Sequence, residues 1–209
     1  MTKPFIISRR GVLAATGAAL AAPALAQARY PDRPIQLVIP WPAGGSADAQ
    51  LRSIAELVGK ALGQPMVVQN RPGAGGTLGP LTVAQQARPD GYTLTQMHLS
   101  VLRRPWMMRT PGWDPICDFT HIIGMTGWLF GTAVKADSPI KSWQDLLAYA
   151  RANPGKLTYS TSGIGTTNHL AMESIQEIEK ISLTHVPFRG ANEGVTAVLS
   201  GQVDMICDS

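Results

Sequence analysis

Residues 38–48 read VIPWPAGGSAD, a short apolar run that passes through a glycine-rich turn into a helix-like run. Residues 157–167 read LTYSTSGIGTT and repeat this order more than a hundred residues later. A turn of this kind exposes backbone N–H groups at the start of a helix, where the helix dipole also favours negative charge. The two turns predict two lobes that each offer a small anion site, and they indicate a protein that binds small carboxylates.

The sequence around these turns alternates strand and helix patterns, which predicts an α/β fold with largely parallel sheets. The expected strands are residues 35–39, 66–69, 92–97, 130–134, 157–160, 183–186 and 203–207. The expected helices are residues 46–62, 78–87, 143–152, 167–179 and 191–200. Residues 102–118 contain three prolines and no clear period, so this segment is expected to be irregular.

Local signals mark where several of these helices begin and end. Ser46 is a favourable N-cap, and Asp48 places an acidic side chain in the first turn. Gly63, followed closely by a proline, predicts the end of the same helix. Ser142 and Asp145 have the spacing of a capping box.

Residues 1–26 are interpreted as an export signal, because three basic residues precede an alanine-rich apolar stretch too short to span a bilayer. Residues 8–13, SRRGVL, are similar to a twin-arginine signal, and an ordinary secretory signal is the alternative. Small residues allow cleavage near Ala26 or Ala28. The mature chain is therefore expected to be periplasmic, with no membrane span.

The charge and cysteine content exclude some kinds of partner. The whole chain has 18 basic and 14 acidic residues, and 15 basic residues remain once the signal is removed. The net charge then falls from +4 to +1 with no basic run, so nucleic acid is not an expected partner. Cys117 and Cys207 are 90 residues apart and are expected to be buried and unpaired, with a disulfide as the alternative.

The candidate ligand-binding residues lie in the two turns. In the first turn they are Ala43, Gly44, Gly45 and Ser46. Asp48 either contacts the ligand or complements the helix dipole. In the second turn they are Ser162, Gly163, Gly165, Thr166 and Thr167. The competing interpretations are a plain tight turn for the first set and an ordinary helix cap for the second.

Other chemistries find little support in the sequence. The glycines of residues 73–79 lack the spacing of a dinucleotide fingerprint, and neither turn is followed by the Gly-Lys-Ser/Thr of a phosphate-binding loop. The four histidines lack metal-ligand spacing, and no nucleophile motif or carboxylate pair stands out. We therefore expect a protein that is not an enzyme and needs neither cofactor nor metal. An exported α/β enzyme acting on a small carboxylate or ester and a ligand sensor for a signalling partner are the alternatives.

At this point the chain resembles the substrate-binding receptors of tripartite tricarboxylate transporters, the Bug receptors. The resemblance covers nearly all of the chain after the signal. It is carried by the segments YPDRPI (30–35), PAGGSAD (42–48), LGQP (62–65), NRPGAGG (70–76), PDGYTL (89–94), DFT (118–120), ANPGKL (152–157), HVPFRG (185–190) and GQVD (201–204). Each segment is weak by itself, but their number and order are specific.

This resemblance implies a two-lobed periplasmic binding protein fold of type II, the Venus-flytrap arrangement, with residues 27–124 in lobe 1 and residues 125–209 in lobe 2. It implies a small mono- or dicarboxylate ligand and delivery to the permease subunits of a tripartite tricarboxylate transporter, with the receptor a monomer. It also implies that Gly75 and Gly76 shape the floor of the cleft, and that Arg189 and Gly190 form its far wall. A plain surface arginine is the alternative for Arg189.

Family members continue well beyond the position of Ser209, and the last expected strand has no helix after it to cover it. We therefore expect the chain to be truncated at its C-terminal end relative to the family, with both lobes incomplete.

Overall fold

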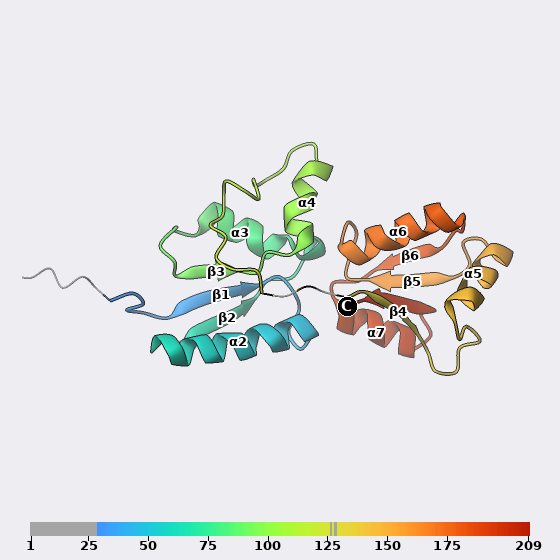
Figure 1. Cartoon of the computed structure of the whole chain (residues 1–209), viewed down its shortest axis with the longest axis horizontal. Helices are drawn as coiled ribbons and strands as arrows, with labels where there is room; N and C mark the ends of the chain where they lie inside the picture. The colour runs from blue at the N-terminus through green and yellow to red at the C-terminus, as the bar shows by residue number, and fades with distance from the viewer. Residues whose placement is uncertain (1–28, 126, 128) are drawn as a thin grey trace, which may run out of the picture. The chain divides into compact units, whose positions relative to one another are not determined.

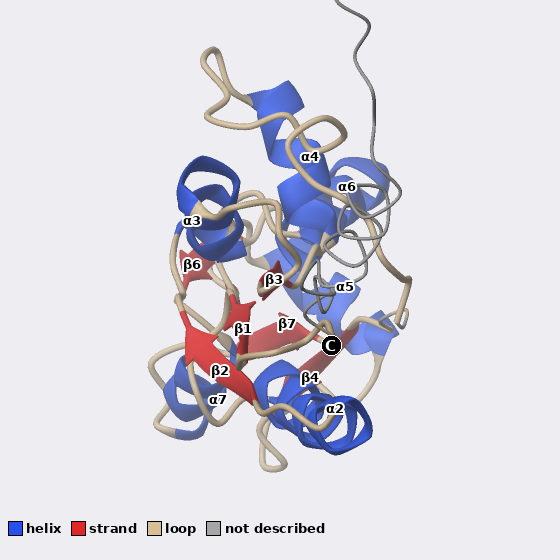
Figure 2. Ribbon diagram, turned by 90° about the vertical axis from the view of Figure 1, so that its left-hand side faces the viewer, coloured by secondary structure: helices blue, strands red, loops and turns tan. Residues whose placement is uncertain are grey.

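The computed structural model describes residues 29–125, 127 and 129–209. The expected export signal at residues 1–26 and its cleavage site lie outside these residues. Residues 33–209 form one compact unit, to which the following description applies. Figure 1 and Figure 2 show that this unit contains two separate β-sheets, each accompanied by its own helices.

The first sheet has three parallel strands in the order β2-β1-β3. The elements are β1 (Ile35–Ile39), α2 (Ser46–Leu62), β2 (Met66–Asn70), η1 (Ala74–Gly76), α3 (Leu78–Gln86), β3 (Thr93–Thr95) and α4 (Leu99–Met107). Leu51 and Ala55 of α2 pack on Leu37 and Ile39 of the central strand. Helices α2 and α3 lie on opposite faces of the sheet (Figure 1), which explains why β1 is apolar along nearly its whole length.

The second sheet has four strands in the order β4-β7-β5-β6, of which only β4 is antiparallel to its neighbour. The elements are β4 (Gly131–Val134), α5 (Trp143–Ala152), β5 (Thr158–Thr161), α6 (Thr167–Glu179), β6 (Thr184–Pro187), α7 (Ala191–Leu199) and β7 (Met205–Asp208). Met205 and Cys207 pack in the cluster that contains α5 and α6, whereas Ile206 packs in the cluster that contains α7. This alternation is the period of two expected for a strand covered on both faces.

Most expected elements are present, and the largest error concerns residues 102–118. The structure has α4 at Leu99–Met107, and this helix includes Pro105. Pro105 cannot donate to the carbonyl of Val101, four residues earlier. The indole N–H of Trp113 donates to that carbonyl instead, at 2.9 Å. A tertiary hydrogen bond thus replaces the helical one, which local proline rules cannot anticipate.

We expect Trp113→Phe to lower the free energy of unfolding by about 1–3 kcal/mol. The ring volume is largely kept, but the buried Val101 carbonyl loses its donor. Urea denaturation monitored by far-UV circular dichroism measures the loss. Trp106→Phe, at a side chain that is 80% exposed, is the control and should change stability by less than about 0.5 kcal/mol. Equal stabilities of wild type and Trp113→Phe would contradict this account of α4.

Two local expectations also need correction. The N-cap of α2 is Gly45 rather than Ser46, which is the first helical residue, and no side chain caps this helix. Cys117 is exposed rather than buried, whereas Cys207 is buried and both thiols are free. By contrast, the capping box of Ser142 and Asp145 is present, and Gly63 ends α2 in the left-handed conformation. Each helix in the described part of the chain is too short or too polar to cross a bilayer.

Candidate functional site

The side chain of Asp48 stabilises the first glycine-rich turn through hydrogen bonds. Its carboxylate accepts hydrogen bonds from the Gly44 amide at 2.9 Å, from Arg52 Nε at 2.9 Å and from Asn70 Nδ2 at 2.7 Å. Burial by itself would raise the pKa of Asp48, but these hydrogen bonds outweigh it and lower the pKa to about 2. Asp48 therefore fixes the conformation of the turn and stays ionised.

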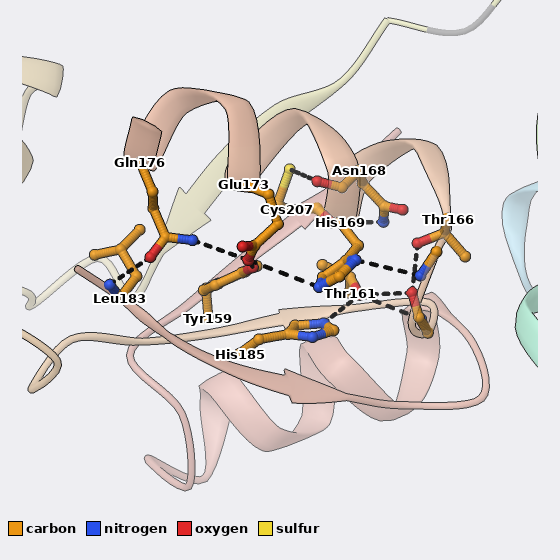
Figure 3. Close-up of polar contacts among 12 residues, drawn as sticks. Tyr159, Thr161, Thr166, Asn168, His169, Glu173, Gln176, Leu183, His185 and Cys207 are labelled. Carbon is orange, nitrogen blue, oxygen red and sulfur yellow. Dashed lines mark hydrogen bonds and ion pairs between the residues drawn. The ribbon is translucent and has the colours of Figure 1, made fainter. Parts of the chain in front are cut away.

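The second turn is held by a similar set of internal hydrogen bonds, shown in Figure 3. Thr166 Oγ1 donates to the Gly163 carbonyl at 2.6 Å, and Thr161 Oγ1 accepts from the Gly163 amide at 3.2 Å. The Gly165 amide donates to Nδ1 of His169 at 3.2 Å. Of the hydroxyl groups that the sequence suggested as ligand donors, that of Thr166 shapes the turn, whereas that of Ser162 donates to Asp208 and that of Thr167 accepts from Arg103.

Four helices begin at one large cavity of about 1110 Å³. The residues at their starts that line it are Ser46 and Ala47 of α2, Leu99 and Ser100 of α4, Thr167 and Asn168 of α6, and Ala191 and Asn192 of α7. The first N–H groups of a helix have no acceptor within that helix. None of these four helices has a side-chain N-cap hydrogen bond. Backbone donors with no side-chain cap are therefore concentrated around this cavity.

Helices α5 and α3 do not begin at this cavity, and N–H groups at their starts have acceptors. The start of α5 carries a complete capping box in which Ser142 and Asp145 satisfy each other's backbone N–H groups. The start of α3 also lacks a side-chain cap, but the amides of Thr77 and Leu78 donate to carbonyls of the preceding residues 73 and 74. At the cavity, the Val101 amide of α4 and the Thr166 amide before α6 also donate to preceding carbonyls, so the uncapped amides are those of the first two residues of each helix.

The structure brings some of the sequence-predicted residues to the cavity and leaves others outside its lining. The cavity is lined by Gly45, Ser46, Ser162, Thr166, Thr167 and Gly190. The residues outside its lining are Ala43, Gly44, Asp48, Gly75, Gly76, Gly163, Gly165 and Arg189. The amides of Gly44 and Gly165 are engaged by Asp48 and His169, and Arg189 is exposed. Gly190 lies against Pro42, so the start of α7 and the first turn are neighbours.

Sequence reasoning missed two parts of this site. At the start of α7 the sequence predicted only Gly190 as a site residue, although Ala191 and Asn192 also line the cavity. The start of α4 was missed because its segment was expected to be irregular. A glycine that directly precedes an amphipathic run, as Gly190 does, was the available signal for α7.

Two arginines of α4 contact the second turn, and one of them also contacts η1. Arg103 Nη2 donates to Thr167 Oγ1 at 3.0 Å, and its buried Nε has no hydrogen-bond partner. Arg104 Nη1 donates to the carbonyls of Ala74 at 2.8 Å and Ile164 at 3.3 Å. Burial lowers the pKa of the neighbouring His98 to about 4, although its hydrogen bond to the Gly76 carbonyl acts the other way. His98 is therefore neutral at pH 7, and Arg103 provides positive charge beside the start of α6.

Three carboxylates also line the cavity, and each of them already accepts a hydrogen bond from the protein. Glu193 accepts from the Arg189 amide at 3.1 Å, and Asp208 accepts from Ser162 Oγ at 3.0 Å. Asp118 is the third acidic side chain of the lining. An anionic ligand would be repelled by these groups and attracted by the helix starts and by Arg88 of the lining, and Arg103 adds positive charge beside the start of α6.

Residues 50–209 match the family described as the tripartite tricarboxylate transporter family receptor. The chain belongs to this receptor family. It is 47% identical over 212 residues to the UPF0065 protein in the gbd 5′ region of Cupriavidus necator, covering 100% of this chain and 64% of that protein.

Solved structures in the same family resemble this one. Rpa4515 of R. palustris with adipate matches with a TM-score of 0.79 and 32% identity, over 86% of this chain and 60% of that chain. MatC (Rpa3494) of Rhodopseudomonas palustris with bound malate matches with a TM-score of 0.77 and 30% identity, over 86% of this chain and 61% of that chain. The fold is therefore that of the family's periplasmic binding proteins, and the chain spans about three fifths of the length of these relatives.

Proposed function

We propose that this receptor-family member binds a small mono- or dicarboxylate in the cavity where α2, α4, α6 and α7 begin. The convergence of four helix N-termini without side-chain caps carries this proposal. Helix N-termini attract anions through free N–H groups and through the helix dipole. Gly45, Ser46, Thr166, Thr167 and Gly190 lie at these helix starts, and Arg103 contributes charge nearby.

The energies favour several amides acting together. Micromolar affinity corresponds to about 8 kcal/mol. The dipole of one exposed helix end supplies only about 0.3–1 kcal/mol, whereas each hydrogen bond to a charged group contributes about 1.5–3 kcal/mol. Three to five amides from at least two helices would therefore be needed, and the cavity provides helix starts from both sheets.

Adipate and malate, which are bound in the two solved relatives, are both dicarboxylates and support the same ligand class here. We further propose that residues 27–124 and 125–209 act as two lobes that close on the ligand, with Arg103 and Arg104 bridging them. The ligand would then pass to permease subunits of a tripartite transporter, after export of the chain to the periplasm and removal of its signal. In this proposal the protein is a monomeric receptor and not an enzyme.

Isothermal titration calorimetry with malate and adipate tests this function. We expect saturable binding of at least one dicarboxylate, and no binding of adipamide, in which both charges are absent. Equal binding of adipate and adipamide, or no binding of either dicarboxylate, would refute an anion site.

A proline substitution tests the backbone donors directly. Ser46 is the first residue of α2, where proline fits the helix and removes one N–H, and the extended Gly45 before it is compatible with proline. We expect Ser46→Pro to raise the Kd for the bound dicarboxylate by about tenfold or more, because one hydrogen bond to a charged group is lost.

Ser46→Ala is the matched control, since it removes the hydroxyl and keeps the N–H, and it should change the Kd by less than about threefold. Ala191→Pro makes the same test at the start of α7. Thermal unfolding of each variant without ligand verifies that the fold is kept. Wild-type affinity in both proline variants would contradict the proposed donors.

A further inference from the structure

His169 caps the second glycine-rich turn in an unusual way. It is the third residue of α6, and its Nδ1 accepts the Gly165 amide at 3.2 Å (Figure 3). Glutamate or glutamine at this helical position commonly reaches back to accept a backbone N–H at the start of the helix. Here an imidazole takes that role, while Thr166 at the N-cap makes no side-chain cap bond.

We propose that neutral His169 is a positioning residue for the carboxylate site, and that its protonation loosens residues 163–166 and weakens ligand binding. This inference rests on the function proposed above. His169 acts through the turn, because Gly165 lies outside the cavity lining whereas Ser162, Thr166 and Thr167 belong to it.

The chemistry of the ring supports this role. Only an unprotonated Nδ1 has a lone pair that can accept the Gly165 N–H, so the hydrogen bond exists only with the proton on Nε2. His169 Nε2 lies 3.7 Å from Glu173 Oε1, which also accepts the hydroxyl of Tyr159 at 2.9 Å. The ring of His185 lies against that of His169, with the ring centroids 4.2 Å apart and the ring planes tilted by 32°.

Three titratable neighbours of His169, namely His185, Tyr159 and Cys207, have pKa values shifted away from neutral pH. Burial lowers the pKa of His185 to about 4, with the nearby His169 acting in the same direction. Burial raises the pKa of Tyr159 far above neutrality and raises that of Cys207 to about 11. On the side of α4, Arg103 is the charged group that reaches α6.

The direction of the pH effect follows from two opposing contributions. A proton on Nδ1 removes the acceptor of the Gly165 amide, while Thr161 and Thr166 continue to hold Gly163, so the loosening is centred on Gly165, which has φ of 76°. The imidazolium charge would attract an anionic ligand, but the Glu173 carboxylate 3.7 Å away largely offsets it. Affinity should therefore fall as the pH falls.

The test measures the Kd for malate at pH 8.0 and pH 6.0 in wild type, His169→Gln and His169→Leu. We expect the wild-type Kd to rise as the pH falls from 8.0 to 6.0, with the loss of one neutral hydrogen bond, about fivefold, as the upper limit. His169→Gln keeps an acceptor that does not titrate, so it should bind like wild type at pH 8.0 and show no such rise beyond the ionisation of malate itself. His169→Leu should be about fivefold weaker at both pH values.

His169→Gln is itself the matched control, because glutamine can accept the same amide without taking up a proton. An undiminished pH dependence in His169→Gln, or wild-type affinity in His169→Leu, would overturn the inference while leaving the proposed function intact. No malate or adipate binding by wild type would instead refute the function, and the inference with it.

Discussion

Gly76→Ala is expected to lower the free energy of unfolding by about 3 kcal/mol. Gly76 has φ of 82°, a left-handed conformation that costs other residues about 1–2 kcal/mol. A Cβ here would lie 2.5 Å from His98 Nε2 and 2.7 Å from Trp41 Cη2, and such overpacking adds about 1–3 kcal/mol. Neither ring can move freely, because Trp41 Nε1 donates to Gln96 Oε1 at 3.0 Å and His98 bonds Gly76 itself.

Gly63→Ala separates the two contributions. Gly63 has φ of 71°, similar to that of Gly76, but nothing lies within 4 Å of its would-be Cβ. We therefore expect a loss of about 1 kcal/mol from the backbone conformation alone. Urea denaturation of both variants measures the difference, and equal losses would show that the contacts of Gly76 with the two rings carry no cost.

Asp48→Ala is expected to lower the free energy of unfolding by about 3 kcal/mol at pH 7, because Arg52 and Asn70 lose a buried partner. The wild type should also lose stability in acid. The folded-state pKa of Asp48 is lowered from 3.8 to about 2, so its contribution is complete above about pH 4 and disappears as the pH falls towards 2. That shift corresponds to about 2 kcal/mol.

Denaturant titrations at pH 7, 4 and 2 measure both effects. Asp48→Ala should lack the part of the acid dependence that Asp48 provides. Asp90→Ala is the control, since Asp90 pairs with Arg33 at the surface and should contribute less than about 1 kcal/mol. If Asp48→Ala lowers the free energy of unfolding no more than Asp90→Ala does, the hydrogen bonds that Asp48 accepts do not stabilise the fold.

Local sequence signals predicted the elements well where each signal acts within its own segment. The capping box of Ser142 and Asp145 placed the start of α5, and Gly63 placed the end of α2. Helix α4 was missed because the rule that proline ends a helix is also local. The donor that compensates for Pro105 comes from Trp113, eight residues further along the chain.

The candidate site was predictable in outline from the same signals. Glycines followed by helix-like runs correctly pointed to helix starts, and Gly45, Ser46 and Thr167 do line the cavity. The sequence could not show which amides remain available. Asp48 and His169 each take up an amide four residues earlier, and whether a side chain reaches back in this way depends on its rotamer and burial.

The helix ends without side-chain caps at the cavity also have a consequence for how such a protein can diverge. The donors around the cavity belong to the main chain, so every residue except proline supplies them. Substitutions at lining positions such as Ala47, Leu99 or Asn192 would change the length and shape of the accepted molecule while the same amides stay in place. Mutations can then change the selectivity among carbon skeletons without changing the affinity for negative charge.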